Sequence, residues 1–408
     1  MFKNFIFLGI SQLANFILPL LIMPLLISKV GSIGFGKIQF SYTFLLLLGF
    51  IVDFSHNITA PRDIAITGFK NRNIHGLVNR ILTTRIFILL LVFMTLLALI
   101  LFVPKFKGEY LMHLLGSTVF IGFALQTNWF YQGLEQMSFI AYANIIGKTA
   151  TILLIITFIN VNHDYVYVPF CFGIGNVISS LILLYIMKKR FKIKIRLIKI
   201  ALILNEIRSE FPVFISNISI ITYMNASTIF LGFYISDTSL GYYSIAERIM
   251  MASRQVLGVF SQVLYPRICK TILIGKKEVM HFMMKVYLPF ITLVIAGCVI
   301  LYFMSPTLIW IVSGKEIPES IKFLKMLSIV PLIVALNIPA YQLLMAYDIK
   351  NGYAYIMIIG AILFIISCPI FINYYEANGA VITIIMIETL LTFSLYCSLY
   401  LNKNKLKI

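Results

Sequence analysis

Charge is scarce in this sequence, and negative charge is scarcest. The 408 residues include 33 lysines and arginines but only 15 aspartates and glutamates, so that 12% of the chain is charged. Soluble globular domains carry about twice that share of charged residues. Hydrophobic residues make up 60% of the chain and its mean hydropathy is +0.96. This composition excludes a sizeable soluble domain and is typical of a protein with many membrane-spanning helices.

Motifs for metal, nucleotide or covalent chemistry are missing as well. The five histidines show no metal-ligand spacing, and no HExxH, CxxC, GxSxG or aspartate-rich motif occurs. The five cysteines have no paired spacing and are interpreted as packing residues. The glycine-rich string VGSIGFGK lies between two apolar stretches, without the preceding strand of a phosphate-binding loop. We therefore expect no cofactor, no metal and no enzymatic activity, and any active transport must draw on ion gradients, membrane potential or substrate flux.

About twelve apolar stretches of membrane-crossing length follow one another along the chain. A bilayer core about 30 Å thick needs roughly 20 apolar residues per helix. The expected spans are residues 5–28, 38–60, 81–103, 111–133, 140–160, 165–187, 211–235, 242–266, 286–312, 321–346, 353–373 and 379–401. The prediction is an all-α integral membrane protein with about 12 transmembrane helices.

Most basic residues fall in the loops on one side of the expected membrane. If the N-terminus is cytoplasmic, the cytoplasmic loops collect most of the 33 lysines and arginines, and Arg80, just before the third span, and Arg85, near its start, are counted with these loops. Cytoplasmic loops are enriched in lysine and arginine, so both termini are expected in the cytoplasm. The positive charge is thus explained as a topology signal, and nucleic acid is not expected as a partner.

The longest cytoplasmic loop divides the chain into two halves. Its sequence, KKRFKIKIRLIKIALILNEIRSE, suggests an amphipathic segment that lies on anionic membrane lipids. We expect an N-terminal six-helix lobe at residues 1–190, a linker at 191–210 and a C-terminal six-helix lobe at 211–408.

Short landmarks recur between the halves. Gly34–Gly36 corresponds to Gly241–Tyr243, and Pro61–Arg62 corresponds to Pro266–Arg267. The offset is nearly constant and each pair has the same topological position. This indicates a duplicated six-helix unit, a plan that places a central cavity and binding site between the two lobes.

Several charged residues lie inside the expected spans. A charge at the centre of the bilayer costs on the order of 2.5 to 3.5 kcal/mol even on lenient insertion scales. Such residues persist where they face a polar or wet interior, so they are candidates for function. They are Lys148, Glu247, Arg248, Arg254 and Glu388.

The span at residues 242–266 concentrates this polarity on one side. A spacing of seven keeps side chains on nearly one face of a helix, which places Arg248 with Gln255 and, in the next row, Glu247 with Arg254. One interpretation is a cationic wall of a central cavity that meets an anionic substrate. The other is that Glu247 and Arg254 neutralise each other in a contact between helices.

Several blocks resemble a known family. They are LPLLIMPLLISKVG in the first span, DFSHNITAPRDIA at the end of the second, NWFYQGLEQM at the end of the fourth, and LGYYSIAERI with LYPRI in the eighth. With them the chain resembles the Wzx-type O-antigen or oligosaccharide-lipid flippases of the multidrug/oligosaccharidyl-lipid/polysaccharide exporter superfamily. The resemblance implies two helical lobes around a central cavity that opens alternately to each side of a bacterial inner membrane. The implied substrate is an oligosaccharide repeat unit linked to undecaprenyl pyrophosphate, with other polysaccharide-assembly proteins as further partners.

The resemblance also implies roles for residues. The candidate substrate contacts are Arg62, Lys148, Arg248, Arg254 and Gln255. The candidates for ion coupling are Asp53, Glu247 and Glu388.

Three alternative functions remain. A multidrug exporter of the same superfamily would be expected to line its cavity mainly with acidic residues. A membrane-embedded polysaccharide polymerase or glycosyltransferase would be expected to show a long outside loop or a cluster of catalytic carboxylates. A lipid II flippase would be expected to have additional helices.

Overall fold

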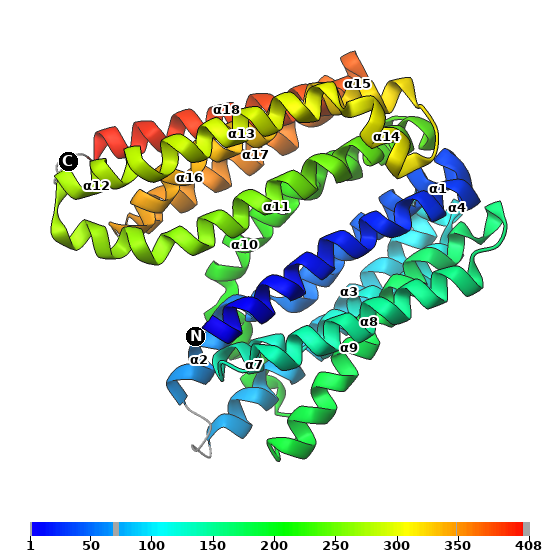
Figure 1. Cartoon of the computed structure of the whole chain (residues 1–408). Coiled ribbons are helices and arrows are strands. Elements are labelled where there is room, and N and C mark those ends of the chain that lie inside the picture. The colour runs from blue at the N-terminus through cyan, green and yellow to red at the C-terminus, as the bar shows by residue number, and fades with distance from the viewer. Residues whose placement is uncertain (1, 68–72, 348, 403–408) are drawn as a thin grey trace. The chain divides into compact units, whose positions relative to one another are not determined.

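The computed structural model describes residues 2–67, 73–347 and 349–402, and every regular element in these ranges is a helix (Figure 1). The chain divides into two compact units, residues 1–221 and 222–408. Helix α10 (Ile200–Tyr234) runs from the first unit into the second.

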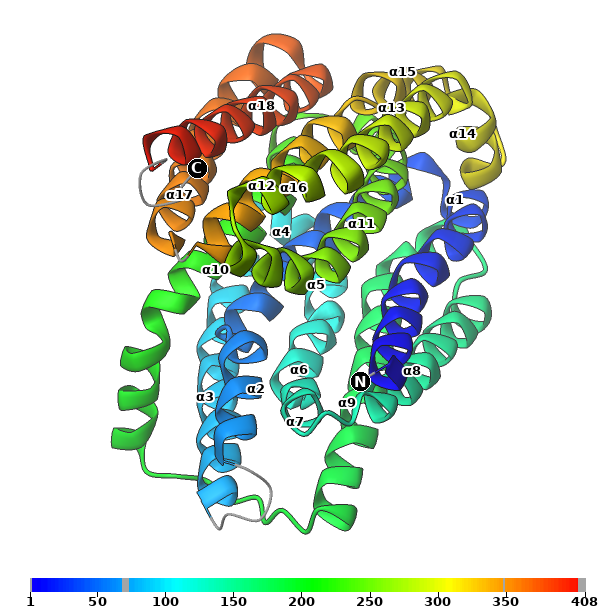
Figure 2. The same ribbon diagram turned by 60° about the vertical axis from the view of Figure 1, so that its left-hand side comes forward.

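The N-terminal unit is a bundle in which α8 and α9 lie side by side and α6 packs on α9 (Figures 1 and 2). Residues 191–199, between α9 and α10, form no helix. The helices of this unit before α10 are α1 (Phe2–Asp53), α2 (His56–Thr67), α3 (Asn73–Phe102), α4 (Pro104–Gly108), α5 (Tyr110–Gly116), α6 (Thr118–Leu125), α7 (Asn128–Gly133), α8 (Met137–Phe158), the 3-10 helix η1 (Asn162–Tyr167) and α9 (Val168–Arg190).

The C-terminal unit is a second bundle, in which α18 packs against both α16 and α17. Its long helix α11 packs against α15 and α16. The helices are α11 (Asp237–Ile274), α12 (Lys276–Phe282), the π-helical turn η2 (Met283–Tyr287), α13 (Leu288–Phe303), α14 (Ser305–Ser313), α15 (Pro318–Leu327), α16 (Val330–Ala346), α17 (Lys350–Tyr375) and α18 (Ala377–Leu401).

The first expected span, 5–28, lies within α1, whereas the second, 38–60, begins in α1 and continues beyond Asp53 into α2. Helix α1 is itself interrupted at Gly31. This glycine has φ 69° and ψ 177°, a non-helical conformation that other residues adopt only with strain. By length and hydropathy, nine helical segments in the described part of the chain can cross a membrane, or ten if the bent α10 is one span. Helix α11, which carries Glu247, Arg248 and Arg254, is not among them.

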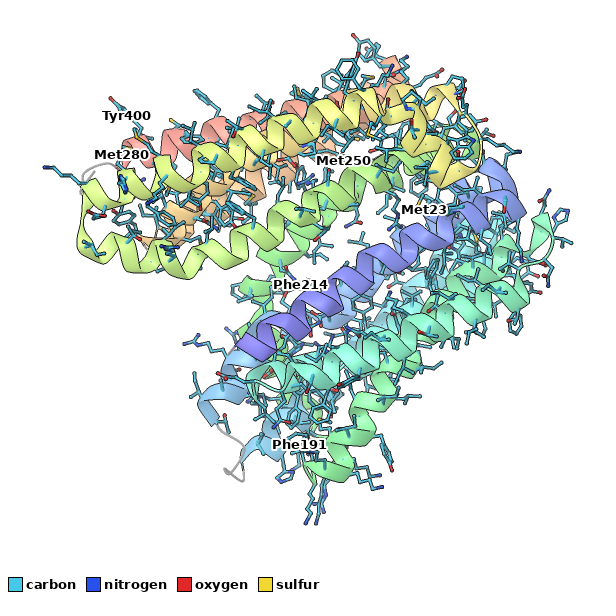
Figure 3. All side chains as sticks on the ribbon, in the orientation of Figure 1. Met23, Phe191, Phe214, Met250, Met280 and Tyr400 are labelled. Carbon is cyan, nitrogen blue, oxygen red and sulfur yellow. The ribbon has the colours of Figure 1, made fainter. Side chains whose placement is uncertain are left out.

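Aromatic packing holds α7 and the end of α9 together at one end of the N-terminal unit. Trp129, Phe130 and Tyr131 of α7 are fully buried, and Phe191 beyond the end of α9 packs edge-on against Phe130 (Figure 3). The Tyr131 hydroxyl donates a hydrogen bond to a backbone carbonyl of α9 at 2.5 Å. The block NWFYQG therefore belongs to the core that fixes α7 against the bundle.

Large apolar side chains also cover the outside of both units. Phe102 is 82% exposed and Phe393 is 75% exposed, and Tyr400 points away from the C-terminal unit (Figure 3). Such surfaces are stable where lipid, rather than water, surrounds the helices.

Candidate functional site

A break between α1 and α2 positions the first group of candidate residues. Phe54 and Ser55 connect the two helices with φ values of 48° and 63°, in the left-handed region that side-chain-bearing residues rarely adopt. The Phe54 ring stacks on Phe214 with centroids 4.3 Å apart, and Asn217 donates to the Ser55 hydroxyl at 3.2 Å. We call this connection the α1–α2 elbow.

A buried ion pair lies directly beside the elbow. Asp53, the last residue of α1, accepts a hydrogen bond from Arg85 of α3, and neither side chain is more than 5% exposed. A second guanidinium nitrogen of Arg85 donates to the carbonyl of Gln126 at 2.6 Å. The assignment of Arg85 to a cytoplasmic loop was wrong, because this residue lies inside α3 and is completely buried. Its charge is tolerated there because the Asp53 carboxylate and the backbone carbonyl of Gln126, at the end of α6, accept hydrogen bonds from it.

The elbow is linked to a second polar region through Asn57 and Gln126. The Asn57 amide donates to Asp53 Oδ1 at 2.7 Å and to Gln126 Oε1 at 3.4 Å. Gln126 follows the last residue of α6, where the helix ends and α7 begins. It also lines a cavity of about 90 Å³ that contains Lys148 of α8.

This cavity, which we call the Lys148 cavity, lies wholly within the N-terminal unit. It is lined by residues of the α6–α7 junction, α8 and α9. Every residue that lines it is polar or glycine: Gln126, Asn128, Asn144, Gly147, Lys148, Gly175, Asn176 and Ser179.

The elbow also contacts the start of α10. His56 Nδ1 lies 2.8 Å from the Asp53 carbonyl, and His56 Nε2 lies 3.6 Å from Glu206 Oε1. Arg80 of α3 pairs with the other Glu206 oxygen at 2.7 Å. Sequence analysis missed Glu206 because it placed this residue in a linker, whereas its side chain is buried against the unit.

Arg62 is the one substrate candidate of the N-terminal unit outside this network. It lies on α2 and is exposed, beside Pro61 inside the helix. The adjacent Pro61 packs closely on Gly133 of α7, since a Cβ on Gly133 would lie 2.7 Å from the Pro61 carbonyl oxygen.

In the C-terminal unit, the structure brings two candidates together. Arg254 of α11 forms an ion pair with Glu388 of α18 at 2.8 Å, and Asn337 of α16 donates to the same carboxylate at 3.3 Å. Tyr223 of α10 lies against both charges. Arg254 thus pairs with Glu388 and not with Glu247, its partner in one of the two interpretations of the sequence.

Glu247 is held by hydroxyl groups instead. It accepts hydrogen bonds from Ser227 at 2.9 Å, Thr228 at 2.6 Å and Tyr243 at 3.1 Å. The remaining candidates of α11, Arg248 and Gln255, are half-buried. Each carboxylate that was singled out for ion coupling therefore has several donors around it.

Among the described residues, no group of three or more histidines, cysteines or carboxylates is arranged to hold a metal ion. The carboxylates named above engage arginines, amides and hydroxyls. These clusters of arginines, amides and hydroxyls keep charged side chains inside the helical bundles. They can also offer hydrogen-bond donors to an anion.

Sequence comparisons place the chain among known proteins. The family described as "Polysaccharide biosynthesis protein" matches residues 1–272. A protein of Escherichia coli (strain K12) named "Putative O-antigen transporter" is 25% identical over 411 residues, covering 100% of this chain and 98% of the relative. A protein of the same name from Shigella dysenteriae is 25% identical over 397 residues, covering 95% and 97%.

Solved structures share the fold. A multidrug resistance MATE family transporter of the MOP superfamily, in an inward-facing conformation, superposes with a TM-score of 0.75 at 13% identity, covering 99% of both chains. The lipid II flippase MurJ, in an inward closed conformation, gives a TM-score of 0.74 at 17% identity, covering 98% of this chain and 88% of MurJ. The predicted all-α membrane fold is confirmed by these likenesses together with the helical structure.

Proposed function

This chain belongs to the polysaccharide biosynthesis protein family, and on that premise we propose that it is a flippase for oligosaccharide repeat units linked to undecaprenyl pyrophosphate. It carries them from the cytoplasmic to the outer leaflet of a bacterial inner membrane by alternating access. The family match confirms the resemblance that was drawn from the sequence blocks.

The observation that carries this proposal is the similarity to O-antigen transporters along the whole chain. The two curated relatives are matched over 100% and 95% of this chain, so the similarity covers both units and not one shared segment. An integral membrane transporter is the common element of the relatives and of the solved structures.

The chemistry of the bundles fits an anionic substrate. A pyrophosphate needs cationic partners, and arginine and lysine inside a helical bundle supply them at low dielectric. We assign substrate contact to Arg62, Lys148, Arg248, Arg254 and Gln255, of which Arg62 is exposed and Arg248 half-buried. In the same proposal Asp53, Glu247 and Glu388 serve ion coupling through the partners that hold them.

A multidrug exporter for cations is disfavoured by the state of the carboxylates. Asp53 pairs with Arg85 and Glu388 with Arg254, so these two buried acids are each already matched by an arginine. A cationic drug would have to displace a guanidinium group at each position, which costs the desolvation of that group.

The orientation of the chain completes the proposal. We place both termini in the cytoplasm, where the segment 191–199 exposes Lys192, Lys194 and Arg196 while Ile193 is buried in the core. Exposed cations beside a membrane attract anionic lipids, worth about 1 kcal/mol each. Other polysaccharide-assembly proteins are further partners in this proposal.

Reconstituted transport tests the function. Purified protein in liposomes receives a fluorescent oligosaccharide on undecaprenyl pyrophosphate, and a membrane-impermeant quencher reports how much crosses. Wild-type protein should equilibrate the leaflets faster than empty liposomes, Arg248→Gln should lose at least ten-fold in rate, and Lys107→Gln, the same charge change at an exposed position, should not. Equal rates with and without wild-type protein would reject the flippase.

A further inference from the structure

The C-terminal unit has a surface groove that contains none of the residues assigned to transport. Its volume is about 570 Å³, within the range of about 300–1,000 Å³ that is usual for small-molecule sites. It lies at the end of the unit where α13, α14 and α15 meet (Figure 1). Tyr302 of α13, Glu316 in the turn before α15, and five residues of α15 line it. We call it the α15 groove.

Helix α15 has two different faces. Its buried face packs against α11 and consists of Ser320, Phe323, Leu324 and Leu327. Its groove face has the spacing of one side of a helix and consists of Pro318, Ile321, Lys322, Lys325 and Met326. All residues of the groove face are exposed or half-buried. The buried face fixes the helix on the bundle, so the groove face is a firmly held surface that combines apolar and basic side chains.

The groove lies at the level where membrane helices meet water. Tyr302 is one residue from the end of the apolar segment Lys277–Phe303, and α15 begins the apolar segment Pro318–Ala346, both long enough to cross a membrane. Tyrosine rings gather at the level of lipid headgroups, and lysine side chains extend toward it. Lys325 Nζ lies 5.5 Å from the centroid of the Tyr302 ring, a cation–π contact that places the ammonium group. A ligand in this groove is therefore placed among lipid headgroups.

The charges along the groove follow the order of groups in a phospholipid. Glu316 lies in the turn outside the helix, whereas Lys322 and Lys325 lie farther along α15 toward the apolar segment. At 1.5 Å per residue the two lysines start about 4.5 Å apart along the axis, so both ammonium groups can reach one phosphate. In a phospholipid the phosphate lies between the acyl chains and the terminal alcohol. The alcohol would therefore meet Glu316, whose carboxylate accepts hydrogen bonds from a primary ammonium group.

Beyond the proposed transport, we propose that the α15 groove binds a phospholipid with a phosphoethanolamine headgroup. Lys322 and Lys325 donate to the phosphate, and Glu316 accepts from the ethanolamine ammonium group. The acyl chains begin beside Tyr302 and Met326. A phosphocholine headgroup has a cation without an N–H donor, and a phosphoglycerol headgroup has no cation, so each satisfies only part of the groove.

Lipid binding to the purified full chain in detergent tests the groove. Native mass spectrometry measures the dissociation constant of the first bound lipid for phosphoethanolamine, phosphocholine and phosphoglycerol lipids with identical acyl chains. We expect the phosphoethanolamine lipid to bind about five-fold more tightly than the other two, as one charge-assisted hydrogen bond at a partly exposed site allows. Equal affinities would overturn the proposal. So would water-soluble glycerophosphoethanolamine that binds as tightly as the lipid.

A matched pair of acidic residues locates the ethanolamine. Glu316→Gln should weaken binding of the phosphoethanolamine lipid about five-fold and leave binding of the phosphocholine lipid unchanged, since only the first donates to the carboxylate. Glu319→Gln is the control, because Glu319 is an exposed acid of α15 that does not line the groove. It should bind both lipids as wild type does. Equal losses for both lipids in Glu316→Gln, or the same loss in Glu319→Gln, would reject the assignment.

The lysines are tested in the same way. The double variant Lys322→Gln with Lys325→Gln should weaken binding of both lipids about ten-fold, because both lipids carry the phosphate. Lys315→Gln, an exposed lysine of the turn that does not line the groove, should bind as wild type does. Unchanged binding in the double variant would place the lipid elsewhere and reject the groove. None of these measurements requires transport, so a chain that fails to move lipid-linked oligosaccharide leaves this proposal intact.

Discussion

At the scale of single residues, the buried carboxylates Asp53, Glu247 and Glu388 each have hydrogen-bonding partners from neighbouring side chains. Asp53 with Arg85 and Arg254 with Glu388 are pairs between helices, while Glu247 is held by three hydroxyl groups. The sequence could identify these positions, because a charge inside an apolar run is conspicuous. It could not identify the partners, since seven-residue spacing on one helix gives no information about the helix that packs opposite.

Removing Arg85 should destabilise the N-terminal unit strongly. Arg85→Met leaves the Asp53 carboxylate buried without its base, and loss of one partner of a buried pair costs about 3–5 kcal/mol. The free energy of unfolding in mixed micelles measures this loss. The double variant Asp53→Asn with Arg85→Met should recover much of it, because no charge is then left unpaired. If the double variant is as unstable as Arg85→Met alone, the ion pair is not the source of the stability.

The Arg254–Glu388 pair allows a structural role to be separated from substrate contact. Arg254→Gln should lower both stability and transport, because it strands Glu388. The double variant Arg254→Glu with Glu388→Arg restores an ion pair in which the acidic and basic side chains have exchanged helices. We expect it to recover the thermal unfolding temperature while transport stays at least ten-fold below wild type. Full transport by the exchanged protein would show that Arg254 serves only to balance Glu388.

At the scale of helices and turns, close backbone contacts shape the site. The apolar runs predict most spans, and they do so because membrane helices need apolar residues of fixed length. They do not predict that α1 ends at an elbow, since Phe54 and Ser55 are not residues that favour a left-handed conformation. The glycines at the α8–α9 crossing carry no signal of their own in the sequence either.

Replacing Gly147 should push α8 away from α9. The Cβ of Gly147→Ala would meet a backbone carbonyl oxygen at 2.4 Å, and backbone cannot move aside as a flexible side chain can. Overpacking of this kind costs about 1–3 kcal/mol. Thermal unfolding of the purified protein measures the loss. Gly76→Ala is the matched control, since nothing lies within 4 Å of a Cβ there, and it should be neutral or stabilising. Similar unfolding temperatures for both variants would contradict the tight crossing.

At the scale of the whole molecule, the chain is two helical bundles joined through α10. The helical fold was predictable because composition and apolar periodicity dominate in a membrane. The packing of the start of α10 on the N-terminal unit was not predictable, because the buried Glu206 lies among exposed leucines in a stretch whose sequence resembles a polar linker. The cytoplasmic location of both termini and of the basic loops, which follows from the positive-inside rule, remains a prediction.

Thiol labelling checks the orientation. In a variant without the five native cysteines, a single cysteine replaces exposed Lys107 or exposed Lys194. If both termini are cytoplasmic, a membrane-impermeant maleimide added to intact cells with a permeabilised outer membrane should label Lys107→Cys and not Lys194→Cys. The reverse pattern would invert the topology and with it the proposed direction of transport.

The elbow between α1 and α2 has an energetic consequence. Two successive side-chain-bearing residues in the left-handed region cost about 1–2 kcal/mol each, and this cost is released if the segment straightens into one continuous helix. Straightening would in turn separate Asp53 from Arg85 and Asn57 and unstack Phe54 from Phe214. Backbone strain and the contacts that restrain it are thus opposed at one point, which the Asn57–Gln126 hydrogen bond joins to the Lys148 cavity.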